Sequence, residues 1–259
     1  MALRPLHIKV TTAGGVATIE IARPEKRNAL SLAMYEAMTQ ALIAAAADDA
    51  VRAVIITGQP GVFAAGNDLE DFLAAPPDTE NSPVLQFIRA LLSFEKPVVA
   101  AVTGTAIGIG VTMLLHCDLV YLSSDAKLSM PFVSLGLVPE SGASLLIPRL
   151  MGHVKAAEKL MLGTPFTAAE AVDLGIANAA LPPENVLSHA RAAAERFNNL
   201  PAAAVRDTKR LMRAGLRAAV EHAVREETEA FVERLRSPEA REALAAFFQR
   251  RKAGSASAG

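Results

Sequence analysis

The 259-residue chain has a single cysteine, Cys117, and no tryptophan. One cysteine cannot form an internal disulfide, which excludes a disulfide-rich secreted scaffold and is typical of a reducing compartment. Residues 1–20 also lack the apolar run of a signal peptide, so we expect a cytoplasmic protein. The formal net charge of -1 gives no basic excess for a nucleic-acid surface, so no nucleic-acid partner is expected.

Several familiar chemistries lack their sequence signatures. The five histidines do not have metal-ligand spacing and no cysteine pairs exist, so we expect no metal site. The glycine run 104–110 is followed by no Lys-Ser or Lys-Thr pair and does not match the dinucleotide fingerprint. Ser144 lacks the second glycine of a nucleophile elbow. Metal, nucleotide-cofactor and serine-nucleophile chemistry are therefore all disfavoured.

Charge is absent from one long run, the 19 residues 97–115. This length is close to the roughly 20 residues that span a bilayer. Pro97 and three glycines make the run a poor continuous helix, because each glycine costs up to ~1 kcal/mol relative to alanine. We interpret it as a buried strand at 98–102, a glycine-rich turn, and a short apolar helix ending near His116. No membrane association is expected.

The remaining pattern predicts mixed α/β structure with a mostly helical end. Gly14-Gly15 predicts a hairpin between two short strands, and Ser31 can cap a helix that runs to about residue 47. After residue 142 helices predominate, and Thr167 with Glu170 forms a capping box. Further elements are expected as strands at 51–57, 119–122 and 126–130, a surface loop at 74–83, a helix at 84–94, and helices opened by Pro183, Pro201 and Pro238.

Two glycine-containing turns, at 63–69 and 104–110, each lie between an expected strand and an expected helix. Backbone amides at such turns point outward, and glycine lets a ligand approach closely. Two of these amides converging on one oxygen would form an oxyanion hole. From the residues alone, tight packing is the better interpretation of such glycines.

Five segments together resemble the enoyl-CoA hydratase/isomerase, or crotonase, superfamily. They are RPEKRNALS (23–31), FAAGNDLEDF (63–72), KPVVAAVTGTAIGIG (96–110), CDLVYLSSDAKLSMPFVSLGLVPE (117–140) and AFFQRRKA (246–253). The resemblance implies an α/β spiral of repeated strand-strand-helix units with a helical C-terminal region. It assigns residues 1–200 to acyl-CoA binding and catalysis, and 201–259 to oligomerisation as a homotrimer or a dimer of trimers.

The resemblance also implies an acyl-CoA thioester substrate, with no cofactor beyond the CoA that the substrate carries. The thioester oxygen would lie between the backbone N–H groups of Asn67 and Ile109. Lys26 and Lys252 are candidate phosphate contacts, with a solvated surface charge as the alternative for each. Other positions implied at the substrate are Ala64, Ala65, Gly66, Asp68, Leu69, Gly108 and Gly110, although Asp68 is better interpreted as a helix cap.

Two positions separate this chain from standard hydratases of the family. Alignment places Thr112 and Phe132 where those enzymes carry their two catalytic glutamates. Neither side chain can act as a carboxylate base, yet hydration needs one group to activate water and another to deliver a proton to carbon. The substitutions argue against a standard hydratase.

One carboxylate remains nearby, Glu140 in the sequence LGLVPESG, which resembles the delta3,delta2-enoyl-CoA isomerase branch. A single base suffices there, since it can take a proton from C2 and return it at C4. Apolar neighbours would raise its pKa toward neutrality. Because Glu140 precedes an expected helix, it could instead favour that helix N-terminus. An atypical hydratase and a catalytically silent acyl-CoA-binding protein are the alternative functions, and the 74–94 region is expected to shape the acyl pocket.

Overall fold

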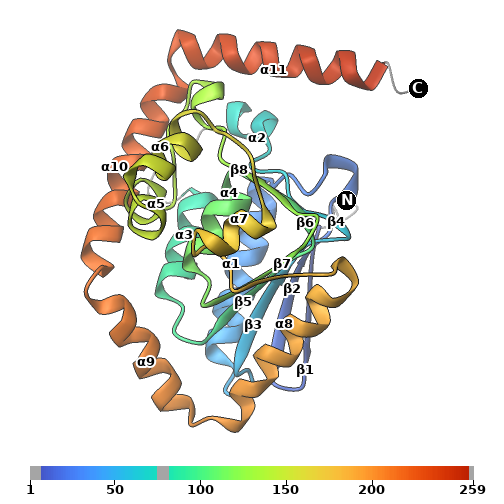
Figure 1. Ribbon diagram of the computed structural model, residues 1–259, viewed down its shortest axis with the longest axis vertical. Helices are drawn as coiled ribbons and strands as arrows, with labels where there is room; N and C mark the ends of the chain where they lie inside the picture. The colour runs from blue at the N-terminus through green and yellow to red at the C-terminus, as the bar shows by residue number, and fades with distance from the viewer. Residues whose placement is uncertain (1–6, 75–81, 257–259) are drawn as a thin grey trace.

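The computed structural model describes residues 7–74 and 82–256, with the backbone alone for 251–256. Its strands form two sheets (Figure 1). The larger sheet contains, in spatial order, β1 (Ile8–Ala13), β2 (Val16–Ile21), β3 (Ala53–Thr57), β5 (Val98–Val102), β7 (Leu119–Ser123) and β10 (Ala179–Leu181). The smaller contains β4 (Gly61–Ala64), β6 (Gly104–Ile107), β8 (Lys127–Ser129) and β9 (Phe166–Thr167).

The spiral expected from the resemblance is confirmed. Each of three successive strand pairs contributes its first strand to the larger sheet and its second to the smaller one, namely β3 and β4, β5 and β6, and β7 and β8. Strands β3 and β5 are buried along their whole length, which explains their continuous apolar sequence. The expected glycine turn at 104–110 is partly wrong, because residues 104–107 form β6 and only Gly108 makes the turn.

Local signals set the first elements as expected. The hairpin between β1 and β2 turns at Gly14-Gly15, where both residues have positive φ. Helix α1 (Leu32–Ala47) begins after Ser31, whose side chain accepts a hydrogen bond from the Met34 N–H. The predicted capping box of Thr167 and Glu170 opens α7 (Ala168–Asp173). The loop expected at 74–83 lies mostly outside the described residues.

Helices cover both faces of the larger sheet. Helix α8 (Val186–Glu195) packs on one face against β3, β5 and β7 (Figure 1). The main hydrophobic core fills the other face. That core includes α1 and α3 (Pro83–Ser93), while α5 (Ala143–Met151) lies against α6 (His153–Met161). Shorter helical segments before residue 200 are α2 (Leu69–Ala74), α4 (Ile109–Thr112) and the 3-10 turns η1 (Pro24–Lys26), η2 (Met113–His116), η3 (Val133–Leu135), η4 (Pro183–Asn185) and η5 (Arg196–Asn199).

Three C-terminal helices form the outside of the molecule. Helices α9 (Ala202–Ala214) and α10 (Arg217–Leu235) follow one another along one side, and α11 (Pro238–Ala256) turns across one end (Figure 1). Helix α10 contacts α5, so the C-terminal helices reach the region that contains Glu140. Within the described ranges, no helix has both the length and the apolar character needed to cross a membrane.

Candidate active site

The two glycine turns follow neighbouring strands of the smaller sheet. Strands β4 and β6 pair in parallel, so their C-terminal ends meet at one edge. Gly66 has φ +94° and Gly108 has φ +56°, conformations that favour glycine. A Cβ added at Gly108 would lie 4.0 Å from the Cα of Gly66, so the two turns are in near contact.

Each turn presents a free backbone donor. Neither the Asn67 N–H nor the Ile109 N–H donates a hydrogen bond to another atom of the described residues. Adjacent amides are paired, since the Asp68 N–H donates to the Leu30 oxygen over 2.8 Å and the Gly108 N–H to the Ser129 oxygen over 2.9 Å. Ile109 is the first residue of α4, where amides have no partner within the helix. The arrangement leaves two unpaired donors on adjacent turns.

Glu140 is buried beside the residues of these turns, with only 8% of its surface exposed. Burial, reinforced by the negative charge of Glu227, raises the pKa of the Glu140 carboxyl to about 7. Hydrogen bonds from the Asn67 amide and the Thr112 hydroxyl favour the ionised form and partly oppose that rise. A carboxyl group with this pKa can accept and return a proton near neutral pH.

Asn67 connects Glu140 to a buried tyrosine on α1. The Tyr35 hydroxyl donates to Oδ1 of Asn67, and the amide of Asn67 hydrogen-bonds to Glu140. Tyr35 has no exposed surface, and burial together with the charge of Glu140 raises its pKa well above the ordinary value. Sequence reasoning missed Tyr35, because no local pattern distinguishes it from other buried residues of α1.

The proposed helix-terminus role of Glu140 is taken by another residue. Helix α5 begins at Ala143, and the Glu227 carboxylate on α10 accepts hydrogen bonds from the N–H groups of Gly142 and Ser144, at 2.6 and 2.7 Å. Carboxylates stabilise helix N-termini in this way. The structure therefore favours a different role for Glu140. No local pattern indicated Glu227, which is 87 residues away.

The two positions of the missing hydratase glutamates are both buried. Thr112 has no exposed surface, and its hydroxyl donates to Oε1 of Glu140 over 3.5 Å. The Phe132 ring lies 3.8 Å from the position of a Cβ on Gly108. One position thus contributes a donor to the remaining carboxylate, and the other an apolar surface beside the turn.

A small cavity of about 20 Å³ lies next to Glu140. Its walls come from α2, α3 and α10, and include Phe72, Val84, Leu85, Ile88 and Phe231. From the 74–94 region, which was expected to shape the acyl pocket, Val84, Leu85 and Ile88 line this cavity, and its use by the acyl chain stays a prediction. The contribution of α10 was not foreseen.

Among the residues predicted to contact CoA, Lys26 and Asp68 form ion pairs within the chain. Lys26 forms an exposed ion pair with Glu70, at 2.8 Å. Asp68 is buried, accepts from the Glu70 N–H over 3.2 Å and pairs with Arg23, which confirms its interpretation as a cap at the start of α2. Lys252 lies in α11, and its side chain is outside the described part of the chain.

The small residues of the turns serve the approach of the two strands. A Cβ on Gly110 would come within 2.8 Å of the Ala64 oxygen, so α4 packs directly on β4 only because residue 110 is glycine. Ala65 and Leu69 flank the turn between β4 and α2. Tight packing therefore accounts for the glycine at position 110.

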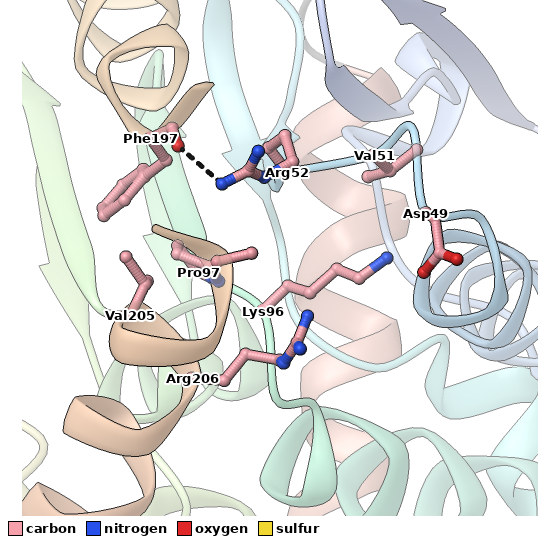
Figure 2. Close-up of a pocket in the computed structure, with 9 residues that line it drawn as sticks. Asp49, Val51, Arg52, Lys96, Pro97, Phe197, Val205 and Arg206 are labelled. Atoms are coloured by element: carbon pink, nitrogen blue, oxygen red, sulfur yellow. Dashed lines mark hydrogen bonds between the residues drawn. The ribbon is translucent and has the colours of Figure 1, made fainter. Parts of the chain in front are cut away.

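A second cavity, of about 280 Å³, lies at another place and contains none of the predicted site residues. Figure 2 shows Arg52, Lys96 and Arg206 among its lining residues. Two of these cations already bind backbone carbonyls: Lys96 those of Ala45 and Asp48, and Arg52 those of Phe197 and Leu200. These contacts tie the ends of α1 and η5 to the larger sheet.

His116 is buried and Cys117 is partly buried, and neither has a role in the proposed chemistry. A ring nitrogen of His116 lies 2.7 Å from the Ser141 oxygen, and burial lowers the pKa of the ring to about 4. Burial raises the pKa of the Cys117 thiol to about 12. Within residues 7–74 and 82–256, no three His, Cys, Asp or Glu side chains are arranged to hold a metal ion.

The two-sheet spiral and the paired glycine turns define the crotonase fold. The chain belongs to the enoyl-CoA hydratase/isomerase family, whose model matches residues 11–255. Among solved structures it is similar to OdaA of Pseudomonas aeruginosa, with 52% identity and a TM-score of 0.91 over 93% of this chain and 98% of that one.

Two of the curated relatives carry names that correspond to different reactions. Enoyl-CoA delta isomerase 2 of Rattus norvegicus is 35% identical over 85% of this chain and 57% of its own length, so this chain spans little more than half of that protein. A probable enoyl-CoA hydratase of Rhizobium meliloti (strain 1021) is 30% identical over 94% of this chain and 95% of its own.

Proposed function

We propose that the chain is an acyl-CoA isomerase that moves the double bond of a 3-enoyl-CoA to give the 2-enoyl-CoA. Glu140 is the sole base, and the N–H groups of Asn67 and Ile109 hold the thioester oxygen. The name of the rat relative agrees with this reaction, and the name of the Rhizobium relative corresponds to the alternative, hydration.

In the proposed mechanism, Glu140 removes a proton from C2 and the C2–H bond breaks. The electron pair is delocalised through the carbonyl to give a dienolate, and the oxygen gains negative charge. The two backbone donors stabilise that charge, and loss of one such donor typically costs about 2.7–4 kcal/mol of transition-state stabilisation. Protonated Glu140 then returns the proton at C4, which leaves the double bond between C2 and C3.

The observation that supports this reaction most strongly is the buried carboxyl of Glu140, whose pKa is raised to about 7. An ordinary glutamate, with a pKa of about 4.3, would be a weaker base toward the C2 proton, whereas a carboxyl group with a pKa of about 7 is a stronger base that is still partly ionised at neutral pH. The side chains at Thr112 and Phe132 supply no second carboxylate, so a one-base reaction fits the site better than hydration.

The direct test is incubation of the purified protein with a 3-enoyl-CoA and, separately, with a 2-enoyl-CoA. We expect the absorbance of the conjugated 2-enoyl thioester to appear from the first substrate, and little 3-hydroxyacyl-CoA from the second. Glu140→Gln should abolish the isomerisation while CoA-ester binding persists. Rapid hydration would favour the atypical hydratase, and binding without either reaction would favour a silent binder.

We further propose that the chain assembles as a trimer through its outer helices. Large apolar side chains are exposed on α9, including Leu211 at 64% and Met212 at 79%, and on α6, including Val154 at 82%. Burial of such side chains between subunits would remove apolar surface from water. A mass measurement in solution tests the assembly, and a monomer at micromolar concentration would contradict it.

A further inference from the structure

Asn67 carries two donors with different directions. Its backbone N–H is unpaired at the glycine turn, and its side-chain amide donates to the Glu140 carboxylate. One residue therefore links the proposed oxyanion site to the proposed base. Its amide must keep a particular orientation, because Oδ1 facing a carboxylate would repel it.

Tyr35 is the group that can hold this orientation. Its hydroxyl donates to Oδ1 of Asn67, which leaves Nδ2 free to face Glu140. The ring is fixed in the core, since it has no exposed surface and lies 5.5 Å from the Phe87 ring. The helix that carries it, α1, contributes none of the side chains that line the cavity beside Glu140.

We propose that Tyr35 is a positioning residue, which fixes the Asn67 amide so that Nδ2 donates to Glu140 and thereby sets the acidity of the base. The expected effects on the rate rest on the proposed function, whereas the positioning of Asn67 does not. The orientation of Asn67 and the acidity of Glu140 can be measured in the absence of turnover.

The other ionisable groups near Glu140 must be considered before a change in its pKa is attributed to Tyr35. Glu227 on α10 raises the pKa of Glu140, and Tyr35 on α1 is kept neutral by burial. His116, which contacts the backbone oxygen of the next residue, Ser141, is neutral near pH 7 because its pKa is lowered to about 4. Asp68, next to Asn67, is paired with Arg23.

The test is Tyr35→Phe, with Thr39→Val as a matched control. Thr39 lies one turn further along α1, is also buried, and donates its hydroxyl to the backbone oxygen of Tyr35 rather than to Asn67. The first readout is an infrared titration of the protonated carboxyl band that disappears in Glu140→Gln. We expect Tyr35→Phe to move the midpoint of this band to higher pH, whereas Thr39→Val leaves it in place.

The second readout is the pH dependence of kcat with a 3-enoyl-CoA. In Tyr35→Phe the ascending limb should move to higher pH, with kcat reduced about tenfold at pH 6.5, KM nearly unchanged and most of the rate recovered at high pH. An unshifted infrared midpoint, or a rate loss that is uniform across pH, would overturn the proposal. Absence of isomerisation in the wild type would instead overturn the proposed function, and the infrared midpoints would still decide the role of Tyr35.

Discussion

The carboxylate of Glu227 lies close enough to Glu140 for its charge to contribute to the raised pKa of that buried carboxyl. Glu227 is fixed on α10 by the N–H groups of Gly142 and Ser144, in the segment that follows Glu140. Two carboxyl groups from distant parts of the chain therefore influence one another at the start of α5. This relationship gives the C-terminal helices an influence on the acidity of the candidate base.

Replacement of Glu227 by glutamine should lower the pKa of Glu140, because the like charge is removed while one amide oxygen can still accept from the helix N-terminus. The ascending limb of the kcat–pH profile should then move to lower pH, opposite to the shift expected for Tyr35→Phe. Glu226→Gln, an exposed neighbour on the same helix, should leave the profile unchanged. A shift to higher pH in Glu227→Gln would contradict this account.

Ionisation of Glu140 should make the fold less stable as pH rises. The pKa of Glu140 is about 7 in the folded protein against an ordinary value of 4.5, so the folded state binds more protons between these pH values. Stability from this group is present below about pH 4.5 and is lost as pH rises to about 7. The full effect is about 3 kcal/mol.

Glu140→Gln, which cannot ionise, should therefore gain in stability relative to the wild type as pH rises from 5 to 8. Chemical denaturation of both proteins across this range measures the difference. Equal dependence of the two proteins on pH would show that Glu140 has an ordinary acidity in the folded state.

The narrow cavity beside Glu140 should limit the acyl chain that the site accepts. Ile88 lines this cavity from α3, whereas Leu91 is buried on the same helix without lining it. Ile88→Ala should raise kcat/KM for longer 3-enoyl-CoA substrates relative to short ones, by about tenfold for each additional methylene group that fits into the enlarged cavity. Leu91→Ala should lose about 2–5 kcal/mol of stability, as Ile88→Ala does, without changing the chain-length preference.

Sequence patterns predicted much of the fold because its local signals are strong. Ser31, Gly14-Gly15 and the capping box at Thr167 each specify a helix start or a turn through contacts within a few residues. The strand β6 was missed because its glycine looks like a turn residue, although Gly104 is needed there: a Cβ would come within 2.2 Å of the Gly61 carbonyl carbon on β4. That requirement arises from strand pairing, which a local pattern does not reveal.

The candidate site likewise contains some residues that the sequence predicted and others that it did not. The motif resemblance indicated Glu140, Asn67 and Ile109, and the structure brings the two turns together and buries Glu140 beside Asn67. Tyr35 and Glu227 were not found, because their relation to Glu140 depends on how α1 and α10 pack around it. The sequence around each of these two residues contains no glycine, helix cap or unusual spacing that would distinguish it.

The most direct test of the central claim, that Glu140 alone carries the proton, is the fate of the hydrogen at C2. A 3-enoyl-CoA labelled with deuterium at C2 is converted in ordinary water, and the product is analysed by mass spectrometry and NMR. A single carboxyl predicts that part of the deuterium appears at C4 of the 2-enoyl-CoA, and that Glu140→Gln gives no conversion. Conversion by Glu140→Gln at the wild-type rate would contradict the account.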